Sequence, residues 1–364
     1  MATSVVPPPE TDEPTVPSPR VGRGAVHWGR ETAGHGFWAA TSGTGDRSRE
    51  PLALGAPVCR SRAVTEEHGR RPAARAAGDL DWSGEVGRRW AEEVERYDRM
   101  LEPLIGPCLD AAALAPGDRV VDVGCGAGAS TLAAARRVGP SGHVLGVDVS
   151  SVLLSLARRR LRGSSVQGWV TLACADAQDH PLAPASLDAV ISRLGMTYFA
   201  DPRTALANLA QALRPGGRLA FSCWQAESRN PWAGAPREAI SAHLRLPPAT
   251  DAERGPFGLA DPRRIRERLR MAGFGQISVE PVMQPMQIGH DEDDAMGFYR
   301  RGGLSAFLQR VPPPLASAIL DTLVGRLRRH RTTDGVVLDG AAWLVTARVV
   351  GRPQIPLTPK KTVR

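Results

Sequence analysis

The segment VVDVGCGAGAS, residues 120–130, constrains the fold of this chain more than any other. It joins a short β-branched run to a helical pattern through three alternating glycines, Gly124, Gly126 and Gly128. Glycine has no Cβ, so such a loop can bring its backbone close to a ligand. A simple strand-to-helix turn needs fewer glycines. Residues 124–129 also match the G-x-G-x-x-G/A pattern of dinucleotide-binding loops. The loop therefore predicts an adenosine-containing cofactor and leaves its identity open.

Short apolar strands alternate with helical patterns between Asp118 and Trp224. The expected strands are RVVDVG, HVLGVD, WVTLAC, LDAVIS and RLAFSCW, and the expected helices cover residues 130–138, 151–161 and 202–213. This alternation predicts a mostly parallel sheet with helices on both faces. In such sheets ligands bind beyond the carboxyl ends of the strands, where the strand order reverses.

A carboxylate ends the second expected strand. Asp148 lies twenty positions after Gly128, and a carboxylate there can accept hydrogen bonds from both ribose hydroxyls. The alternative is that Asp148 caps the following helix, but Ser150 or Ser151 supplies that cap better. A ribose-binding Asp148 suits NAD and S-adenosylmethionine equally well.

A second carboxylate, Asp176, follows the third expected strand in CADAQ. It can accept a hydrogen bond from the exocyclic amine of adenine, while the backbone N–H of Ala177 donates to the ring. The alternative is an Asx turn that only stabilises the loop. Adenine contact at this position favours S-adenosylmethionine over a nicotinamide cofactor.

From about Trp82 to Val350 the chain resembles the class I S-adenosylmethionine-dependent methyltransferases. It is most similar to the branch that includes the ubiquinone/menaquinone-biosynthesis C-methyltransferases. The matching segments, in order, are VVDVGCGAG, GVDVS, CADAQ, LDAVISRLGMTYFADP and ALRPGGRLAFSCW, and NPWAG, GFGQISVEP and AAWLVTARV continue the likeness. The resemblance implies a doubly wound, Rossmann-like α/β fold. Its seven-stranded sheet is mostly parallel, with an antiparallel last strand and a helical cap over the acceptor pocket.

The resemblance also implies which residues hold the cofactor, S-adenosyl-L-methionine. Asp122 would help hold the amino group of its methionine part, which the three glycines line. Val149 would lie against the adenine, and Ser192 and Arg193 beside the carboxylate and methyl group. The turn RPGG before the fifth strand is expected to be structural. The expected cofactor-binding residues are Asp122, Gly124, Gly126, Gly128, Asp148, Val149, Asp176, Ala177, Ser192 and Arg193.

The acceptor side has aromatic candidates and no identified catalytic residue. The sulfonium methyl group is already activated, so alignment and exclusion of water can supply much of the acceleration. His290 and Tyr198 are candidates for a general base, which is needed only if the acceptor proton is poorly acidic. For His290 the alternative is a loop histidine without a role, and for the aromatic residues it is core packing. The acceptor-binding candidates are Tyr97, Tyr198, Trp224, Trp232 and Tyr299.

Composition excludes several classes of protein. The chain is 42% hydrophobic and 23% charged, and no apolar stretch is long enough to span a membrane. The N-terminus lacks a basic segment followed by an apolar one, so a cytoplasmic location is expected. The formal charge of +8 comes almost entirely from arginine. It fits either the coding bias of a GC-rich genome or a basic surface. The five cysteines show no spacing typical of a metal site, and no metal is expected.

The chain divides into five expected regions. Residues 1–78 are rich in Pro, Gly, Ser and Arg without periodicity, which predicts a disordered N-terminal extension. An N-terminal helical segment covers 79–110, and the cofactor-binding core covers 111–235. Residues 236–352 complete the fold, with helices near 237–245, 262–271 and 291–330 and strands QISVEPV and AAWLVTARVV. A flexible tail covers 353–364.

The sequence thus predicts a methyltransferase with a small-molecule acceptor that is quinone-like, phenolic or a secondary metabolite. The alternatives are a nucleic-acid or protein methyltransferase, an NAD(P)-dependent oxidoreductase and a non-catalytic cofactor-binding protein. Enzymes that methylate base amines carry an Asn/Asp-Pro-Pro-aromatic element after the fourth strand, where this chain reads SRLGMTYF, so a nucleic-acid partner is not expected. A monomer or a homodimer is expected. The methylated atom, carbon, oxygen or nitrogen, is left open.

Overall fold

The computed structural model describes residues 80–246 and 255–350. All of them belong to one compact unit. The predicted extension at 1–78 and the predicted tail at 353–364 lie outside the described residues. The expected boundaries near residues 110 and 235 stay predictions.

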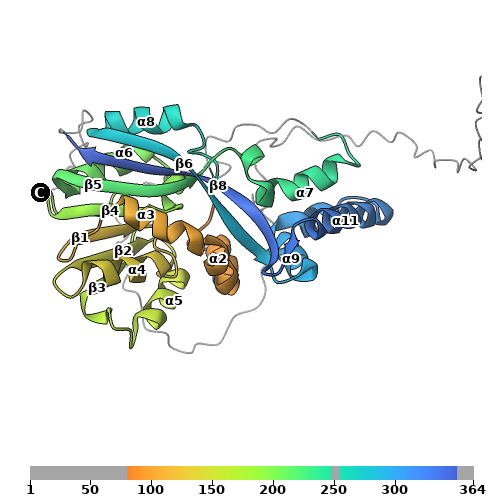
Figure 1. Ribbon diagram of the computed structural model, residues 1–364, viewed down its shortest axis with the longest axis horizontal. Helices are drawn as coiled ribbons and strands as arrows, with labels where there is room; N and C mark the ends of the chain where they lie inside the picture. Colours follow the sequence, from red (N-terminus) through yellow and green to blue (C-terminus); the bar gives the residue numbers. More distant parts are fainter. Residues whose placement is uncertain (1–79, 247–254, 351–364) are drawn as a thin grey trace, which may run out of the picture. The chain divides into compact units, whose positions relative to one another are not determined.

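The helices alternate with the strands as expected from the sequence (Figure 1). The α-helices are α1 (Glu85–Glu92), α2 (Val94–Leu101), α3 (Ile105–Ala111), α4 (Ala129–Val138), α5 (Ser151–Leu161), α6 (Pro202–Ala212), α7 (Pro231–Ser241), α8 (Pro262–Met271), α9 (Glu292–Tyr299), α10 (Ser305–Leu308) and α11 (Pro313–Arg328). Shorter helical turns are η1 (Glu102–Leu104), η2 (Gln167–Trp169), η3 (Gly195–Tyr198), η4 (Glu227–Arg229) and η5 (Arg300–Leu304).

The strands form one mixed sheet in the order β3-β2-β1-β4-β5-β8-β6. Strands β1 to β5 run parallel, and β8 is antiparallel to both β5 and β6. This confirms the predicted doubly wound, mostly parallel sheet with an antiparallel last strand. A further strand of two residues, β7, pairs with β8. The bounds are β1 (Arg119–Val123), β2 (His143–Asp148), β3 (Val170–Cys174), β4 (Leu187–Arg193), β5 (Leu213–Trp224), β6 (Phe274–Gly289), β7 (Arg331–Thr332) and β8 (Gly335–Val349).

Helices cover both faces of this sheet. Because side chains alternate along a strand, Val120 of β1 packs in the core beneath α3 and α4. Its neighbour Val121 packs on the opposite face, in the core beneath α6 and α8. Several helices begin where a capping side chain precedes the first turn. Asp201 accepts from the Arg203 and Thr204 backbone N–H groups at the start of α6, which satisfies amides that the helix leaves unpaired.

A third core lies at the far end of β6 and β8. Both strands are longer than the sequence pattern predicts, and they run out to α7, α9 and α11 (Figure 1). Helix α7 begins at Pro231, whereas a loop was expected until about residue 237. Burial of Trp232 and Ala233 outweighs the loop-like Pro and Gly composition of this segment.

The RPGG segment, expected as a turn before the fifth strand, lies within β5. The pairing of β5 with β4 shifts register here, and Gly216 takes φ +73°. A bulge of this kind accommodates extra residues in a strand. The expected turn therefore needs correction: the segment is an irregular start of β5.

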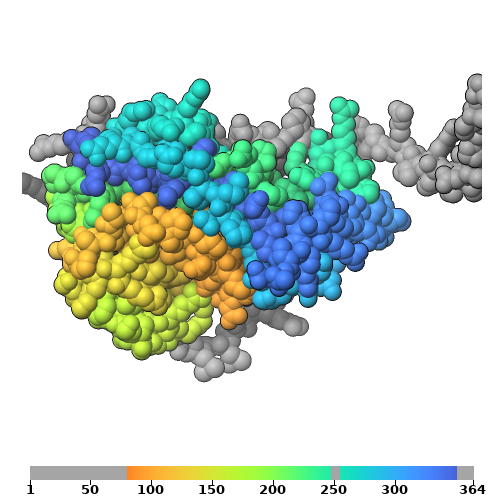
Figure 2. All heavy atoms as spheres, in the orientation of Figure 1, coloured from red at the N-terminus to blue at the C-terminus, as the bar shows by residue number. Residues whose placement is uncertain are grey.

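Arg96 joins the N-terminal helices to the far end of β6 and to α9. Its side chain is only 8% exposed and donates from Nε to Glu93 at 2.7 Å and from Nη1 to the Ile288 carbonyl at 2.8 Å. It also pairs with the carboxylate of Asp294. In Figure 2 the orange N-terminal segment lies between the yellow part of the chain and the blue C-terminal part.

Among residues 80–246 and 255–350, no helix is long and apolar enough to cross a bilayer. The same residues contain no group of three or more His, Cys, Asp or Glu side chains that could hold a metal ion.

Replacing Arg96 with alanine leaves the carboxylate of Asp294 and the Ile288 carbonyl without their cationic donor. We expect the free energy of unfolding, measured by urea denaturation, to fall by about 3 kcal/mol. The control is Arg88→Ala, because Arg88 pairs with Glu85 on the surface with more than half of each side chain exposed. That variant should lose less than about 1 kcal/mol. Equal losses of unfolding free energy in the two variants would show that Arg96 does not hold α2 to β6 and α9.

Candidate functional site

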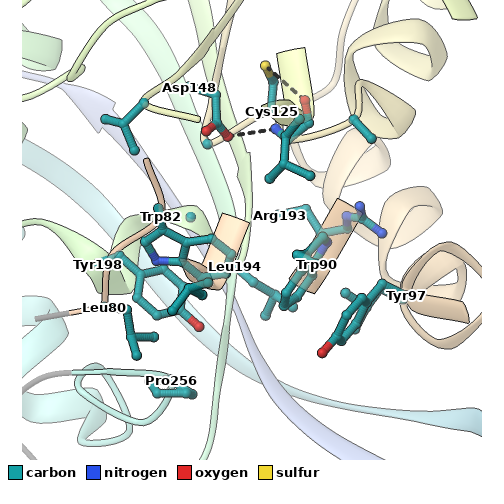
Figure 3. A pocket seen from close by; sticks show the side chains of 18 of the residues that line it. Leu80, Trp82, Trp90, Tyr97, Cys125, Asp148, Arg193, Leu194, Tyr198 and Pro256 are labelled. Carbon is teal, nitrogen blue, oxygen red and sulfur yellow. Dashed lines mark hydrogen bonds between the residues drawn. The ribbon is translucent and has the colours of Figure 1, made fainter. Parts of the chain in front are cut away.

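A cavity of about 480 Å³ lies at the carboxyl ends of β1, β2 and β4. The chain turns from β1 toward β2 on one side and from β4 toward β5 on the other, so the two connections diverge and leave a crevice. This volume is in the range of small-ligand pockets. One side of the cavity is polar backbone and carboxylate, and the other side is aromatic (Figure 3).

The glycine loop forms the polar side. Gly124, Gly126 and Gly128 all have positive φ, at +68°, +53° and +87°, a region that favours glycine. The backbone N–H groups of Gly124 and Cys125 both donate to the Val147 carbonyl, at 2.9 and 3.1 Å. The loop is therefore fixed to the end of β2, and residues 123–127 line the cavity.

Asp148 lines the cavity beside this loop. Its Oδ2 accepts from the Gly126 N–H at 2.7 Å, the dashed line at Asp148 in Figure 3. Its Oδ1 accepts from the Ser150 N–H at 2.8 Å. Burial raises the pKa of Asp148, and these backbone hydrogen bonds oppose that effect. Ser150 caps α5 by accepting from the Leu153 N–H, as expected. Each Asp148 oxygen keeps a further lone pair for a ligand hydroxyl.

Asp176 and Ala177 line the cavity beyond the end of β3, and Val149 lines it beyond the end of β2. Asp176 forms the Asx turn that was the alternative interpretation, because its Oδ1 accepts from the Gln178 N–H at 2.9 Å. The other carboxylate oxygen makes no hydrogen bond to a residue that the structure describes. The turn and a ligand contact are therefore compatible.

Asp122 is buried behind the glycine loop, and the half-buried Arg193 lies beside it. Asp122 is fully buried, and its Oδ2 accepts from the hydroxyls of Ser130 at 2.7 Å and Thr131 at 2.6 Å. Its Oδ1 and the Nη1 of Arg193 are buried without a hydrogen-bond partner among the described residues. Burial raises the pKa of Asp122 to about 6, although the two hydroxyls lower it. Arg193 lines the cavity, whereas Asp122 does not.

Four other predicted site residues do not line the cavity. Gly128 precedes α4 and lies against Ala157 of α5. Ser192 donates its hydroxyl to the Val123 carbonyl at 2.7 Å. Tyr299 is 1% exposed in the core between α9 and its neighbours. His290 is exposed at the start of α9, where its backbone N–H donates to Asp294.

Aromatic rings form the other side of the cavity. Trp82 contacts Trp90 and Tyr198 edge to face, with ring centroids 5.2 and 5.0 Å apart. Trp90 and Tyr97 stack with centroids 3.6 Å apart (Figure 3). The predicted acceptor-side residues Tyr97, Tyr198, Trp224 and Trp232 all line the cavity, joined by Trp82, Trp90 and Phe298.

The sequence interpretation missed those last three rings as site residues. Trp82 and Trp90 fall in the segment 79–110, which was expected only to be helical. Helical spacing could have placed Trp90 and Tyr97 on one side of a helical segment, seven positions apart. No pattern in the sequence indicates that this side meets the cavity rather than the core.

The comparisons with known proteins agree with this geometry. A family model described as a methyltransferase domain matches residues 121–221. The chain is 28% identical to nocamycin O-methyltransferase of Saccharothrix syringae over 265 residues, 68% of this chain and 91% of that protein. It is 40% identical to demethylmenaquinone methyltransferase of Symbiobacterium thermophilum over 112 residues, 30% of this chain and 43% of that protein.

Among solved structures, the YcgJ protein of Bacillus subtilis is similar with a TM-score of 0.45 and 16% identity. The match covers 67% of this chain and 97% of that one.

The matched domain contains the glycine loop, Asp148, Asp176 and the end of β4, all of which meet at one cavity. The matched domain family and the two relatives are all named for methyl transfer. This agreement supports S-adenosylmethionine as the cofactor rather than a nicotinamide. Residues 121–221 match a methyltransferase domain, and the chain is similar to S-adenosylmethionine-dependent methyltransferases, including one of their quinone-biosynthesis branch.

Proposed function

We propose that the cavity binds S-adenosylmethionine on its glycine-loop side and a flat, largely apolar small molecule on its aromatic side. The observation that carries this proposal is the division of one cavity into a polar backbone wall and an aromatic wall. The two relatives compared above are named for nocamycin and demethylmenaquinone, which are both small molecules. We propose a quinone-like, phenolic or related secondary metabolite as the acceptor.

The polar wall fits the adenosine part of the cofactor. Asp148 would accept from the ribose hydroxyls with the lone pairs that the Gly126 and Ser150 amides leave free. Val149, which is 39% exposed at the cavity wall, offers an apolar surface for the adenine face. Asp176 would accept from the exocyclic amine through the oxygen that the Asx turn does not use.

The buried charges fit the amino acid part. An α-amino acid end carries an ammonium and a carboxylate. Among the residues that the structure describes, the site has an unpaired carboxylate oxygen on Asp122 and an unpaired nitrogen on Arg193. Buried polar atoms without partners are costly, so a ligand that satisfies both would bind favourably. Asp122 would act on the ammonium directly or through water, and Arg193 on the carboxylate. Gly128 and Ser192 would support the loop and the end of β1 from behind.

Bound S-adenosylmethionine supplies a methyl group already activated by its sulfonium. The protein then mainly orients the acceptor and excludes water. Burial raises the pKa of Tyr97 to about 12 and the pKa of Tyr198 above its usual range. Both phenols stay protonated near pH 7 and would donate hydrogen bonds rather than take the acceptor's proton. His290 is not on the cavity wall, so we propose no histidine base.

Three further expectations stay predictions. We propose a small molecule rather than nucleic acid or protein as the methyl acceptor, because aromatic residues line the acceptor side. A monomer or homodimer and a cytoplasmic location are expected from the sequence. The direct test of the acceptor is incubation with isotopically labelled S-adenosylmethionine and a metabolite extract of the source organism, followed by identification of the labelled product. A labelled macromolecule without a labelled small molecule would contradict the proposal.

Replacing Asp148 with alanine should weaken S-adenosylhomocysteine binding by at least about tenfold, because a carboxylate–hydroxyl contact is worth about 1.5–3 kcal/mol. Isothermal titration calorimetry measures this affinity. The control is Asp179→Ala, since Asp179 is exposed and does not line the cavity. Binding at the wild-type level by Asp148→Ala would exclude the ribose assignment.

The affinity for S-adenosylhomocysteine should depend on pH through Asp122. With its pKa raised to about 6, the carboxylate is ionised above pH 6 and becomes protonated as the pH falls through 6. The attraction to the ligand ammonium should therefore be strongest near pH 8 and decline below pH 6. Asp122→Asn should bind more weakly at pH 8, with a flatter pH profile from 5 to 8. Parallel pH profiles for the wild type and Asp122→Asn would show that Asp122 does not act on the ligand ammonium.

Replacing Trp90 with leucine removes a ring from the acceptor wall while the glycine loop is unchanged. Formation of the labelled product should fall about tenfold, while the dissociation constant of S-adenosylhomocysteine should stay within about twofold, since an aromatic contact contributes of order 1 kcal/mol. The matched control is Trp169→Leu, because Trp169 lies outside the cavity wall and donates to the Ala135 carbonyl. Unchanged product formation by Trp90→Leu would exclude the aromatic wall as the acceptor site.

A further inference from the structure

We propose that Arg160 is a positioning residue for the amino acid end of S-adenosylmethionine, and that it acts by holding Asp98 away from Arg193. The inference rests on the cofactor placement proposed above. Neither Arg160 nor Asp98 belongs to a sequence motif of the domain, and they meet only in the folded chain.

Arg160 connects two walls of the cavity. It lies near the end of α5, where its Nη1 donates to the Ala127 carbonyl at 3.3 Å and its Nη2 pairs with Asp98 Oδ2 at 2.5 Å. Ala127 belongs to the glycine loop and Asp98 belongs to α2, and both line the cavity. One guanidinium therefore fixes the distance between the cofactor loop and the N-terminal helices.

Asp98 acts electrostatically on Arg193. Burial lowers the pKa of Arg193, and Asp98 is the strongest charge that opposes this effect, followed by Asp122. Arg193 nevertheless has an Nη1 that finds no hydrogen-bond partner within residues 80–246 and 255–350, so Asp98 attracts the guanidinium without satisfying that nitrogen. Arg193 lies on the cavity wall near Trp90 and Tyr97 (Figure 3).

This arrangement suits a zwitterion. The amino acid end of the cofactor needs a free cation for its carboxylate, and Arg193 supplies one only while no protein carboxylate pairs with it. Arg160 occupies the Asp98 carboxylate. Without Arg160, Asp98 is free to turn toward Arg193 and form an ion pair that competes with the ligand carboxylate. The role of Arg160 is therefore to keep Arg193 available.

An arginine is required for this role. The planar guanidinium offers donors in two directions, and here one nitrogen reaches a carbonyl while the other reaches a carboxylate. The ammonium of lysine is a single point on a flexible chain and does not hold both partners in one geometry. The Arg160 and Asp98 side chains are half-buried, 29% and 30% exposed, so solvent screens part of their attraction, and thermal unfolding of each variant checks that it folds.

The test compares two ligands that share the adenosine and the sulfur. S-adenosylhomocysteine carries the amino acid end, and 5′-methylthioadenosine lacks it. We expect Arg160→Met in the full chain to raise the dissociation constant of S-adenosylhomocysteine about tenfold, the scale of one charge-assisted hydrogen bond, and to leave that of methylthioadenosine within about twofold. Arg160→Lys should behave like Arg160→Met. The control is Arg159→Met on the same helix, where Arg159 is exposed and outside the cavity wall.

A double variant separates positioning from simple loss of charge. Asp98→Asn combined with Arg160→Met removes the carboxylate that would compete for Arg193, so S-adenosylhomocysteine affinity should recover by at least about threefold over the single variant. No recovery would overturn the proposal, as would equal losses for both ligands or no loss for either. Failure of the wild-type chain to bind either ligand would overturn the cofactor placement itself, a different outcome from the loss of selectivity.

Discussion

The structure depends on the close approach of two backbones at the point where the strand order reverses. A Cβ on Gly124 would lie 2.9 Å from the Gly195 Cα, and a Cβ on Gly195 would lie 2.7 Å from the Val123 carbonyl oxygen. These distances exclude side chains at both positions. The loop after β1 and the loop after β4 therefore meet without side chains between them, and the amides of the glycine loop are held at the ends of β1 and β2. The placement of Asp148 and of the end of β4 follows from that contact.

The N-terminal helices belong to both halves of the cavity. Helix α1 packs on α5 through Gly87, where a Cβ would lie 2.1 Å from the Trp82 carbonyl oxygen and 2.6 Å from the Ser150 hydroxyl. This brings Trp82 and Trp90 over the carboxyl end of β2. Arg96 joins α2 to the far end of β6, while Arg160 joins α2 to the glycine loop. The helices that form the aromatic wall are thus anchored to the proposed cofactor side by short polar contacts.

Much of the fold could be predicted from the sequence because its signals are local. A buried parallel strand reads as a short β-branched run, and a helix after it begins at a glycine, a serine or an Asp-Pro pair, as at α4, α5 and α6. Predictions failed where burial outweighs composition. Pro231 and Gly234 suggest a loop, yet α7 forms because Trp232 and Ala235 are buried against the third core. The RPGG segment suggests a turn, yet its backbone continues as an irregular β5.

The sequence by itself determined the order of the strands along the chain, the glycine loop and the carboxylates that follow β2 and β3, because each is a pattern within a few neighbouring residues. Only the tertiary structure decided which aromatic rings reach the cavity. Tyr198 and Tyr299 look equally suitable in the sequence, but one lies on the cavity wall and the other packs into the core of α9. The same holds for the contacts of Arg160, which join residues 33 and 62 positions away along the chain. Such contacts depend on how helices pack in three dimensions. The spacing of residues along the chain does not indicate that packing.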